Sequence, residues 1–207
     1  MKVLLINGSP NKAGCTNAAL CEIAKTLAEC GVDSEIVHIG AGPFHGCTDC
    51  KGCAKTHRCV FGGDCVNSLI EKMEGSDGLI VGSPVHFASA AGPVVCVLDR
   101  MFRAGGDCYA HKPAAAVASA RRAGTIPTVD ELNKYFSIRQ MPLVSSSYWN
   151  VVYGAKAEET ARDLEGMQTM RNLARNMAWM LKCFAAGRER GVEPPKNESG
   201  ARTNFIS

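Results

Sequence analysis

Val3-Leu4-Leu5-Ile6-Asn7-Gly8-Ser9-Pro10 is the stretch of sequence that decides the fold. Four consecutive apolar residues that end in a Gly-Ser-Pro turn are typical of a strand buried on both faces of a parallel sheet. Apolar residues then recur at helical spacing from Leu20 to Leu27, and Gly31 follows as a helix stop. The opening therefore predicts the first strand and helix of an α/β protein.

The same alternation continues along the chain. Further strands are predicted over 34–39, 78–82, 114–119 and 143–146, and further helices around 66–73, around 94–101, from a Thr128-x-x-Glu131 capping box, and over 157–186. Five strands interleaved with five helices predict a doubly wound α/β sandwich. One domain is expected over 1–186, followed by an extended tail over 187–207 that contains Pro194-Pro195.

Composition narrows the class of protein. The chain has 207 residues, of which 46% are hydrophobic and 21% charged, as in an ordinary globular protein. A net charge of +3 without a basic run does not favour a nucleic-acid partner. We find no secretory signal after Met1 and no apolar stretch of the roughly 18 residues that a spanning helix needs. The expectation is a cytoplasmic protein with no membrane partner and reduced thiols.

Four thiols stand inside thirteen residues, at Cys47, Cys50, Cys53 and Cys59. This crowding favours an iron–sulfur cubane, because short gaps let successive thiolates converge on one small cluster. Tetrahedral zinc is the second interpretation, although zinc sites more often pair two separated CxxC motifs. Free structural thiols are the third. Cys65 is the one credible substitute ligand, since it lies six residues beyond Cys59 across Gly62-Gly63.

Three loops follow the predicted strands at the carboxyl ends, where doubly wound sheets bind ligands. The first carries hydroxyls and amides that suit phosphate oxygens near a helix N-terminus: Ser9, Asn11, Thr16 and Asn17. An ordinary turn and helix cap would explain these residues equally well. The second combines residues against which a planar ring can lie: Pro84, Val85, His86 and Phe87. The third offers small residues and guanidinium donors: Ser119, Ala120, Arg121, Arg122 and Gly124. The two arginines could equally be solvated loop charges.

Short motifs in a fixed order carry a resemblance over nearly the whole chain. They are Gly8-Ser9-Pro10, Thr16-Asn17, the four cysteines, Gly82-Ser83-Pro84-Val85, Asp99-Arg100, Ser119-Ala120-Arg121-Arg122, Tyr148-Trp149-Asn150 and Gly166-Met167-Gln168-Thr169. In this set the chain resembles the flavodoxin-fold NAD(P)H-dependent FMN reductase family, and within it the iron–sulfur flavoproteins.

The resemblance implies a flavodoxin-like three-layer sandwich with a five-stranded parallel sheet and noncovalent FMN. It implies that the loop from Ser9 to Asn17 holds the FMN phosphate, that Pro84 to Phe87 flank the isoalloxazine, and that Ser119 to Gly124 contact its ring. The cysteine loop over 44–60 would hold a [4Fe-4S] cluster, and the protein would be a homodimer or homotetramer. The chain departs from the family where His86 replaces a common Tyr, and where the acidic residues after the fourth cysteine are reduced to Asp64.

Electron transfer is the predicted activity, from a donor such as NAD(P)H to a small-molecule or protein redox partner. FMN accepts two electrons as hydride, whereas a cubane passes one at a time. No residue pattern points to hydrolysis, and His86 is the one candidate proton donor. Two alternatives stay open: a cluster-free flavin or quinone reductase, and a zinc- or thiol-based redox sensor.

Overall fold

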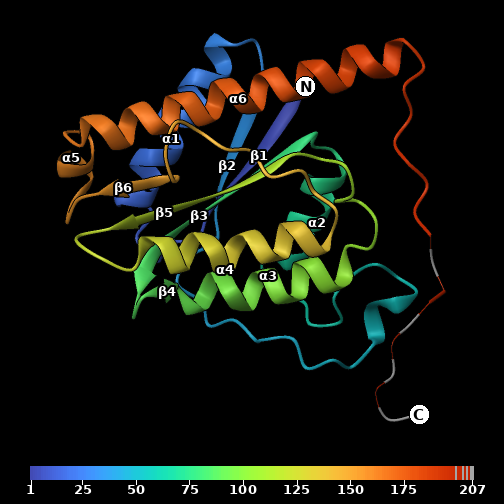
Figure 1. Cartoon of the computed structure of the whole chain (residues 1–207). Helices are drawn as coiled ribbons and strands as arrows, with labels where there is room; N and C mark the ends of the chain where they lie inside the picture. Colours follow the sequence, from blue (N-terminus) through green and yellow to red (C-terminus); the bar gives the residue numbers. More distant parts are fainter. Residues whose placement is uncertain (199, 202, 204, 206–207) are drawn as a thin grey trace.

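A parallel sheet forms the centre of the molecule (Figure 1). The computed structural model describes residues 1–198, 200, 201, 203 and 205. Five parallel strands pair in the order β2-β1-β3-β5-β6, and the short β4 pairs antiparallel with β3. Their bounds are β1 Lys2–Asn7, β2 Asp33–His38, β3 Gly78–His86, β4 Ser89–Ala90, β5 Ala114–Ala120 and β6 Val151–Tyr153. This is the flavodoxin-like order, so the predicted fold class is confirmed.

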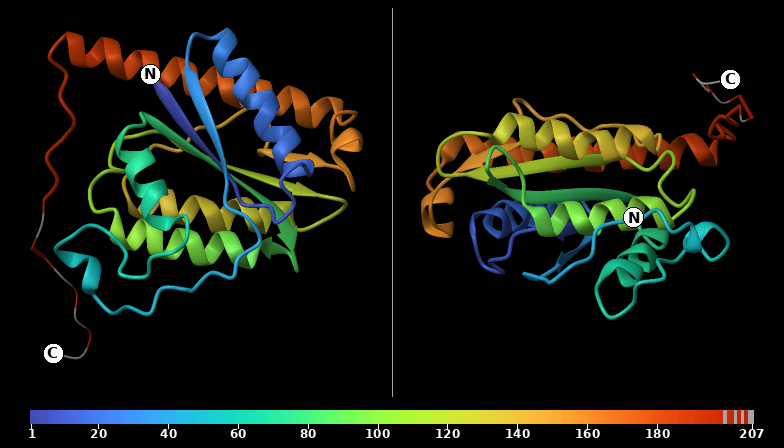
Figure 2. Two further views of the ribbon diagram at one scale, coloured as in Figure 1. Left: turned by 180° about the vertical axis from the view of Figure 1, so that it is seen from behind. Right: turned by 90° about the horizontal axis from the view of Figure 1, so that it is seen from below.

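Helices cover both faces of the sheet (Figure 2). The first face carries α1 Cys15–Glu29 and α6 Leu164–Glu189, and the second carries α2 Val66–Glu74, α3 Gly92–Ala104 and α4 Thr125–Ile138. The alternation of side chains along β1 explains the two layers. Leu4 and Ile6 are buried in the core under α2 to α4, whereas Val3 and Leu5 are buried under α1 and α6. A strand that is apolar at every position is therefore required.

The sheet reverses its winding between β1 and β3, which are neighbours. The Gly8 N–H donates to the Gly82 carbonyl over 2.8 Å just beyond the end of β1. A Cβ at Gly8 would stand 2.7 Å from two atoms of the Val94 side chain, so only glycine allows this close approach. The strand ends thus leave room for a ligand at the switch point of the sheet.

The strand predicted over 143–146 is wrong. Leu143 forms only an isolated bridge to Ala114, and the fifth parallel strand is β6. The physical reason lies in Ser146, whose hydroxyl donates to the Tyr148 carbonyl over 2.5 Å and lies 2.7 Å from Asn150 Oδ1. A side chain that bonds the nearby backbone in this way turns the chain and competes with a strand ladder.

Two helix boundaries also differ from prediction. α4 begins at Thr125, one turn before the predicted capping box, and the Thr128 hydroxyl donates to the Gly124 carbonyl inside the helix. The predicted helix over 157–186 is two helices, α5 Ala157–Thr160 and α6. Asp163 separates them, because its carboxylate accepts the Gly166 N–H over 2.9 Å and starts α6 anew.

The carboxyl-terminal tail begins slightly later than expected. α6 continues to Glu189, three residues into the predicted tail, and described residues beyond Gly191 lie outside helices and strands. The predicted tail residues 199, 202, 204, 206 and 207 lie outside the described part of the chain. No helix among the described residues is long and apolar enough to cross a membrane.

Candidate functional site

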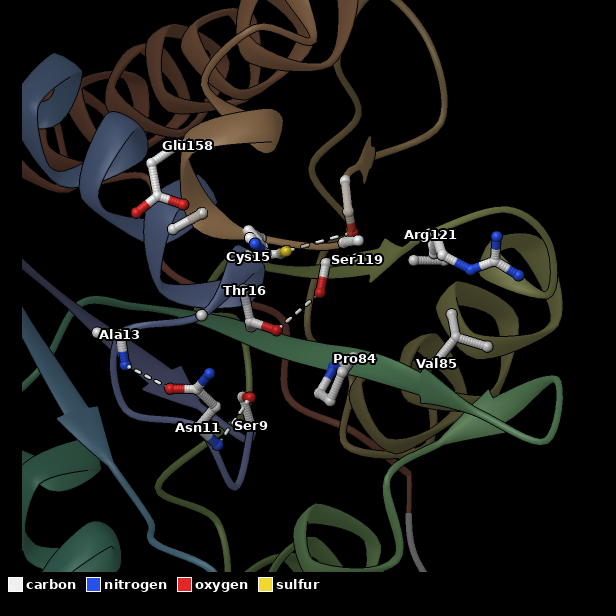
Figure 3. Close-up of a pocket in the computed structure, with 16 residues that line it drawn as sticks. Ser9, Asn11, Ala13, Cys15, Thr16, Pro84, Val85, Ser119, Arg121 and Glu158 are labelled. Carbon is white, nitrogen blue, oxygen red and sulfur yellow. Dashed lines mark hydrogen bonds between the residues drawn. The ribbon is translucent and has the colours of Figure 1, made fainter.

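A cavity of about 490 Å³ opens where β1, β3 and β5 end (Figure 3). Eight of the residues predicted to bind a cofactor line it, namely Ser9, Asn11, Thr16, Pro84, Val85, Ser119, Ala120 and Arg121. They come from three loops that are far apart in sequence. The fold therefore brings most of the predicted ligand site together at the switch point of the sheet, and we refer to this cavity as the strand-end pocket.

Buried hydroxyls order one wall of the strand-end pocket. Thr16, at the start of α1, is 1% exposed, and its hydroxyl lies 2.8 Å from that of Ser119 at the end of β5. The hydroxyl of Ser9 accepts the Asn11 N–H over 3.1 Å, and this bond fixes the turn after β1. Because these hydroxyls are already fixed, they can form hydrogen bonds to a ligand with little further loss of conformational entropy.

The amino end of α1 faces the same pocket. Its N-cap residue is Gly14, and no side chain caps the helix. Gly14 and the first two helical residues, Cys15 and Thr16, line the cavity. Uncapped N–H groups and the positive end of the helix dipole favour an anion such as phosphate. This wall therefore has the chemistry of an anion site, and its assignment to the FMN phosphate, which the resemblance implies, stays a prediction.

Five predicted binding residues do not line the strand-end pocket: Asn17, His86, Phe87, Arg122 and Gly124. Asn17 bonds instead to Asn7 Nδ2 over 3.3 Å and to Cys21 Sγ over 3.4 Å. Phe87 is fully exposed at the β3–β4 turn, where its φ is 52°. Gly124, with φ of 89°, lies against Val85 and Ala88, which a Cβ at this position would meet.

The sequence reasoning missed a second wall, made by the chain after β6 and the start of α5. It consists of Gly154, Ala155, Lys156, Ala157 and Glu158 (Figure 3). Cys15 joins this wall to α1, since its thiol donates to the Gly154 carbonyl over 3.3 Å. The signal was weak because three of its five residues are Gly or Ala. Lys156 and Arg121 add two cations to the lining.

The four cysteines singled out by their spacing lie around one small hollow beside the end of α3. Its lining includes Cys47, Cys50, Cys53 and Cys59, and does not include Cys65. We refer to it as the cysteine hollow; its volume is about 20 Å³. All the cysteines of the chain are free thiols.

Unusual backbone turns bring these thiols together. The loop has no strand and one 3-10 turn, Gly52–Ala54. Asp49, Lys51 and His57 have positive φ, at 50°, 60° and 52°. Each such residue costs roughly 1–2 kcal/mol of conformational free energy. The surrounding contacts must therefore hold the loop in this shape.

Arg100 on α3 supplies several of these contacts. Its side chain is 1% exposed, and its Nε–H donates to Cys59 Sγ over 3.2 Å. The same guanidinium donates to the Phe61 carbonyl over 2.7 Å and forms an ion pair with Asp64. Burial opposes the charge, yet the hydrogen bonds to Asp64 and Cys59 outweigh it and raise the pKa of Arg100. Arg100 is thus a fixed cation in the wall of the cysteine hollow.

The chemistry of this donor set fits an iron–sulfur cluster. Thiolates are the ligands of such clusters, and the lining adds the cations Arg100 and Arg103 and apolar groups such as Phe61. In the described residues no group of three or more His, Cys, Asp or Glu side chains is arranged to hold one metal ion. A four-iron cluster instead binds each thiolate through a different iron atom, so its ligands stand around a volume.

Fold and pocket together define the class: a flavodoxin-like α/β protein with a pocket at the switch point of its sheet. The family model of NADPH-dependent FMN reductase matches residues 1–156. The chain belongs to this family, in its iron–sulfur flavoprotein branch, and is a flavin-dependent oxidoreductase.

Named relatives support this placement. The chain is 28% identical over 190 residues to an iron-sulfur flavoprotein of Methanocaldococcus jannaschii, covering 88% of this chain and 98% of the relative. It is 28% identical over 198 residues to an iron-sulfur flavoprotein of Methanosarcina thermophila, covering 92% and 100%.

Solved structures show the same fold. The NAD(P)H:(acceptor) oxidoreductase FerB of Paracoccus denitrificans superimposes with a TM-score of 0.62 at 20% identity, covering 88% of this chain and 97% of that one. A flavodoxin from the domain Archaea gives a TM-score of 0.59 at 14% identity, covering 88% and 99%. At these identities the likeness concerns the fold alone.

Proposed function

We propose that this oxidoreductase passes electrons from a reduced donor to an acceptor through FMN and a [4Fe-4S] cluster. Cys47, Cys50, Cys53 and Cys59 are the proposed cluster ligands. The observation that carries the proposal is that these four thiols line one hollow, which also contains a buried arginine. Their closeness in space adds to the sequence spacing and to the names of the relatives.

The strand-end pocket is the proposed FMN site. The uncapped start of α1, with Ser9 and Thr16, would bind the phosphate, and Pro84 and Val85 would flank the ring. Ser119, Ala120 and Arg121 would contact the ring system from β5. The buried Thr16–Ser119 pair supports this division, because it links the phosphate wall to the ring wall.

The two cofactors divide the chemistry. FMN accepts two electrons as hydride and can release them singly, whereas the cluster carries one electron at a time. The chain's own residues would bind and orient the flavin, and the buried Arg100, paired with Asp64, would donate a hydrogen bond to one of the four thiolates. NAD(P)H is the proposed donor, and a small molecule or a redox protein is the proposed acceptor.

Association of at least two chains is part of the proposal, with cofactor sites near subunit contacts. The strand-end pocket and the cysteine hollow share no lining residue. α3 begins at Gly92, just after β4, and Arg100 in the wall of the cysteine hollow lies eight residues further along the helix. Eight residues of α-helix span about 12 Å, so a helix of this length stands between β4 and the cysteine hollow within one chain. Contacts between chains would shorten the path between a flavin and a cluster. Light scattering that gives 22.0 kDa, the mass of one chain, at micromolar concentration with FMN bound would contradict association.

The decisive experiment is the absorption spectrum of protein purified without oxygen, with flavin, iron and sulfide counted per chain. We expect one FMN, four iron atoms and four sulfides per chain. FMN without iron would leave a cluster-free flavin reductase, an outcome compatible with a strand-end pocket that contains none of the four cysteines. Stoichiometric zinc without flavin would favour the redox-sensor alternative and would contradict the proposal.

A further inference from the structure

The four thiols of the cysteine hollow are not held alike. Cys47 and Cys50 are exposed, and Cys53 makes only a long contact of 3.9 Å from its sulfur to the Arg103 carbonyl. Cys59 is fixed at both its backbone and its sulfur. The spacing of the four cysteines in the sequence does not show this difference.

Asn67, in α2, fixes the backbone of Cys59. Its side-chain oxygen accepts the Cys59 N–H over 2.8 Å, and its side-chain nitrogen donates to the Cys59 carbonyl over 2.9 Å. The N–H and the carbonyl of Cys59 are thus both hydrogen-bonded to the side-chain amide of Asn67. Asn67 therefore holds the backbone of Cys59 against α2, as one of two anchors on this residue.

Arg100, in α3, fixes the sulfur. Its Nε–H points at Cys59 Sγ over 3.2 Å, while its two terminal nitrogens bond to Phe61 and Asp64. Its guanidinium carbon also lies 5.5 Å from the centre of the Phe61 ring. A planar guanidinium held at this many points keeps one orientation, so the donor at Nε stays directed at the sulfur.

Asp64 completes the arrangement. Its side chain is 15% exposed, and besides the ion pair with Arg100 its carboxylate accepts the Val66 N–H over 3.1 Å at the start of α2. Asp64 therefore balances the buried charge of Arg100 and ties the end of the cysteine loop to α2. Without such a partner a buried guanidinium would be strongly unfavourable.

We infer that Arg100 is a positioning and tuning residue for the proposed cluster: its Nε–H fixes the sulfur of Cys59 and raises the reduction potential through a hydrogen bond to that thiolate. Only the effect on the reduction potential rests on the proposed function. Hydrogen bonds to cluster sulfurs and nearby positive charge stabilise the reduced, more negative state. Cys59 is thus the proposed ligand whose sulfur accepts a hydrogen bond from a buried arginine.

Arg100→Lys is the variant that tests the inference. Lysine keeps a positive charge beside Asp64 but has no fork that can bond to Cys59, Phe61 and Asp64 at once. Arg171→Lys is the control for an arginine–carboxylate pair away from the cysteine hollow, since Arg171, which is partly exposed, forms a 2.6 Å ion pair with Glu22. Thermal unfolding of both variants verifies that each is folded.

The first readout is hydrogen exchange in cluster-free protein. We expect the amides of Cys59 and Val66 to exchange at least several-fold faster in Arg100→Lys than in the wild type, and unchanged in Arg171→Lys. This readout does not depend on a cluster. Equal exchange in Arg100→Lys and wild type would overturn the positioning role.

The second readout is the potential of the reconstituted cluster, measured by anaerobic redox titration. We expect reduction in Arg100→Lys to be about tenfold less favourable, which for a one-electron couple is about 59 mV. Asn67→Ala separates the two roles, because it frees the backbone of Cys59 and keeps the Arg100 donor. It should speed the loss of iron to a chelator and leave the potential near that of the wild type. A potential that is the same in Arg100→Lys and wild type would overturn the tuning role.

The two failures are distinguishable. Wild-type protein that takes up no iron and sulfide would refute the proposed cluster while the exchange experiment still decides whether Arg100 positions Cys59. A wild type that binds the cluster, with an Arg100→Lys variant identical to it in both readouts, would reduce Arg100 to an ordinary buried ion-pair partner.

Discussion

The strand-end pocket and the cysteine hollow are formed by different kinds of local structure. The pocket is made by the ends of three strands and the start of a long helix, and its volume is about 490 Å³. The cysteine hollow is made by a loop with one short 3-10 turn, and its volume is about 20 Å³. The ends of regular elements form the first site, whereas a few side chains from α2 and α3 hold the second.

The difference follows from the kind of bonds each proposed cofactor makes. A flavin is held by hydrogen bonds and packing, which are weak individually and require a cavity that is already shaped. Iron–thiolate bonds are strong enough to order a loop by themselves, because binding free energy of a metal centre also serves as folding free energy. We therefore expect substitutions in the strand-end pocket to weaken FMN binding gradually, and substitution of any of the four thiols to abolish cluster binding.

The largest expected effect is that of Cys50→Ser. Removing one of four proposed ligands should abolish the cluster absorbance and the bound iron and sulfide, while FMN stays bound, because Cys50 does not line the strand-end pocket. Iron, sulfide and flavin analysis of anaerobically reconstituted protein measures this. Cys65→Ser is the control, since Cys65 lies outside the hollow, and both cofactors should remain. Retention of a full cluster in Cys50→Ser would break the comparison.

Thr16→Ala should weaken FMN binding by a graded amount. The loss of one hydrogen bond to a charged group corresponds to roughly 1.5–3 kcal/mol, about a ten- to hundredfold rise in Kd. Fluorescence titration of flavin-free protein with FMN measures it. Lys25→Ala, on the exposed side of α1, does not line the pocket and should cost no more than about 0.5 kcal/mol, the usual range for surface positions. Equal losses in the two variants would contradict the assignment of the phosphate wall.

Gly8→Ala and Gly52→Ala compare the rigidity of the two regions. At Gly8 a Cβ would stand 2.7 Å from Val94 and 2.8 Å from the Gly82 carbonyl, inside a closely packed core. Overpacking of this kind costs roughly 1–3 kcal/mol of unfolding free energy. At Gly52 a Cβ would stand 2.5 Å from Val60 Cγ1, but Val60 is 58% exposed and can move aside. We expect a smaller loss there in urea denaturation; a larger loss at Gly52 would show that the cysteine loop is the more rigid region.

The smallest effect concerns pH and the cysteine loop. Arg58 in this loop donates to both carboxylate oxygens of Glu74 over 2.9 Å, and this hydrogen bond lowers the pKa of Glu74 below its ordinary 4.5. A depressed carboxyl pKa contributes stability that is present above pH 4.5 and is lost as pH falls through the lower, folded value. Hydrogen exchange of the loop should therefore accelerate slightly as pH falls below 4.5, after correction for intrinsic rates. Glu74→Gln should remove this dependence, and a dependence of equal size in that variant would assign it to another group.

Some parts of this protein are determined by the sequence alone. The apolar run from Val3 to Ile6 predicts a strand buried on both faces, because only a doubly covered strand tolerates apolar side chains at every position. The short gaps among the four cysteines also predict which thiols gather, since chain connectivity keeps them close. The strand-end loops lie far apart in sequence, and they gather because parallel strands end at the same edge of the sheet.

Other parts depend on contacts between segments distant in sequence. Local pattern favoured a strand over 143–146, but Ser146 turns the chain and β6 takes the place beside β5. The wall from Gly154 to Glu158 carries almost no side-chain signal, and its position follows from where β6 ends. Arg100 stands 41 residues from Cys59, and only the packing of α3 against the cysteine loop brings its Nε–H to the sulfur. Spacing along the chain selected the thiols, but it carries no information on which one is fixed, because a hydrogen bond depends on distance and direction in space.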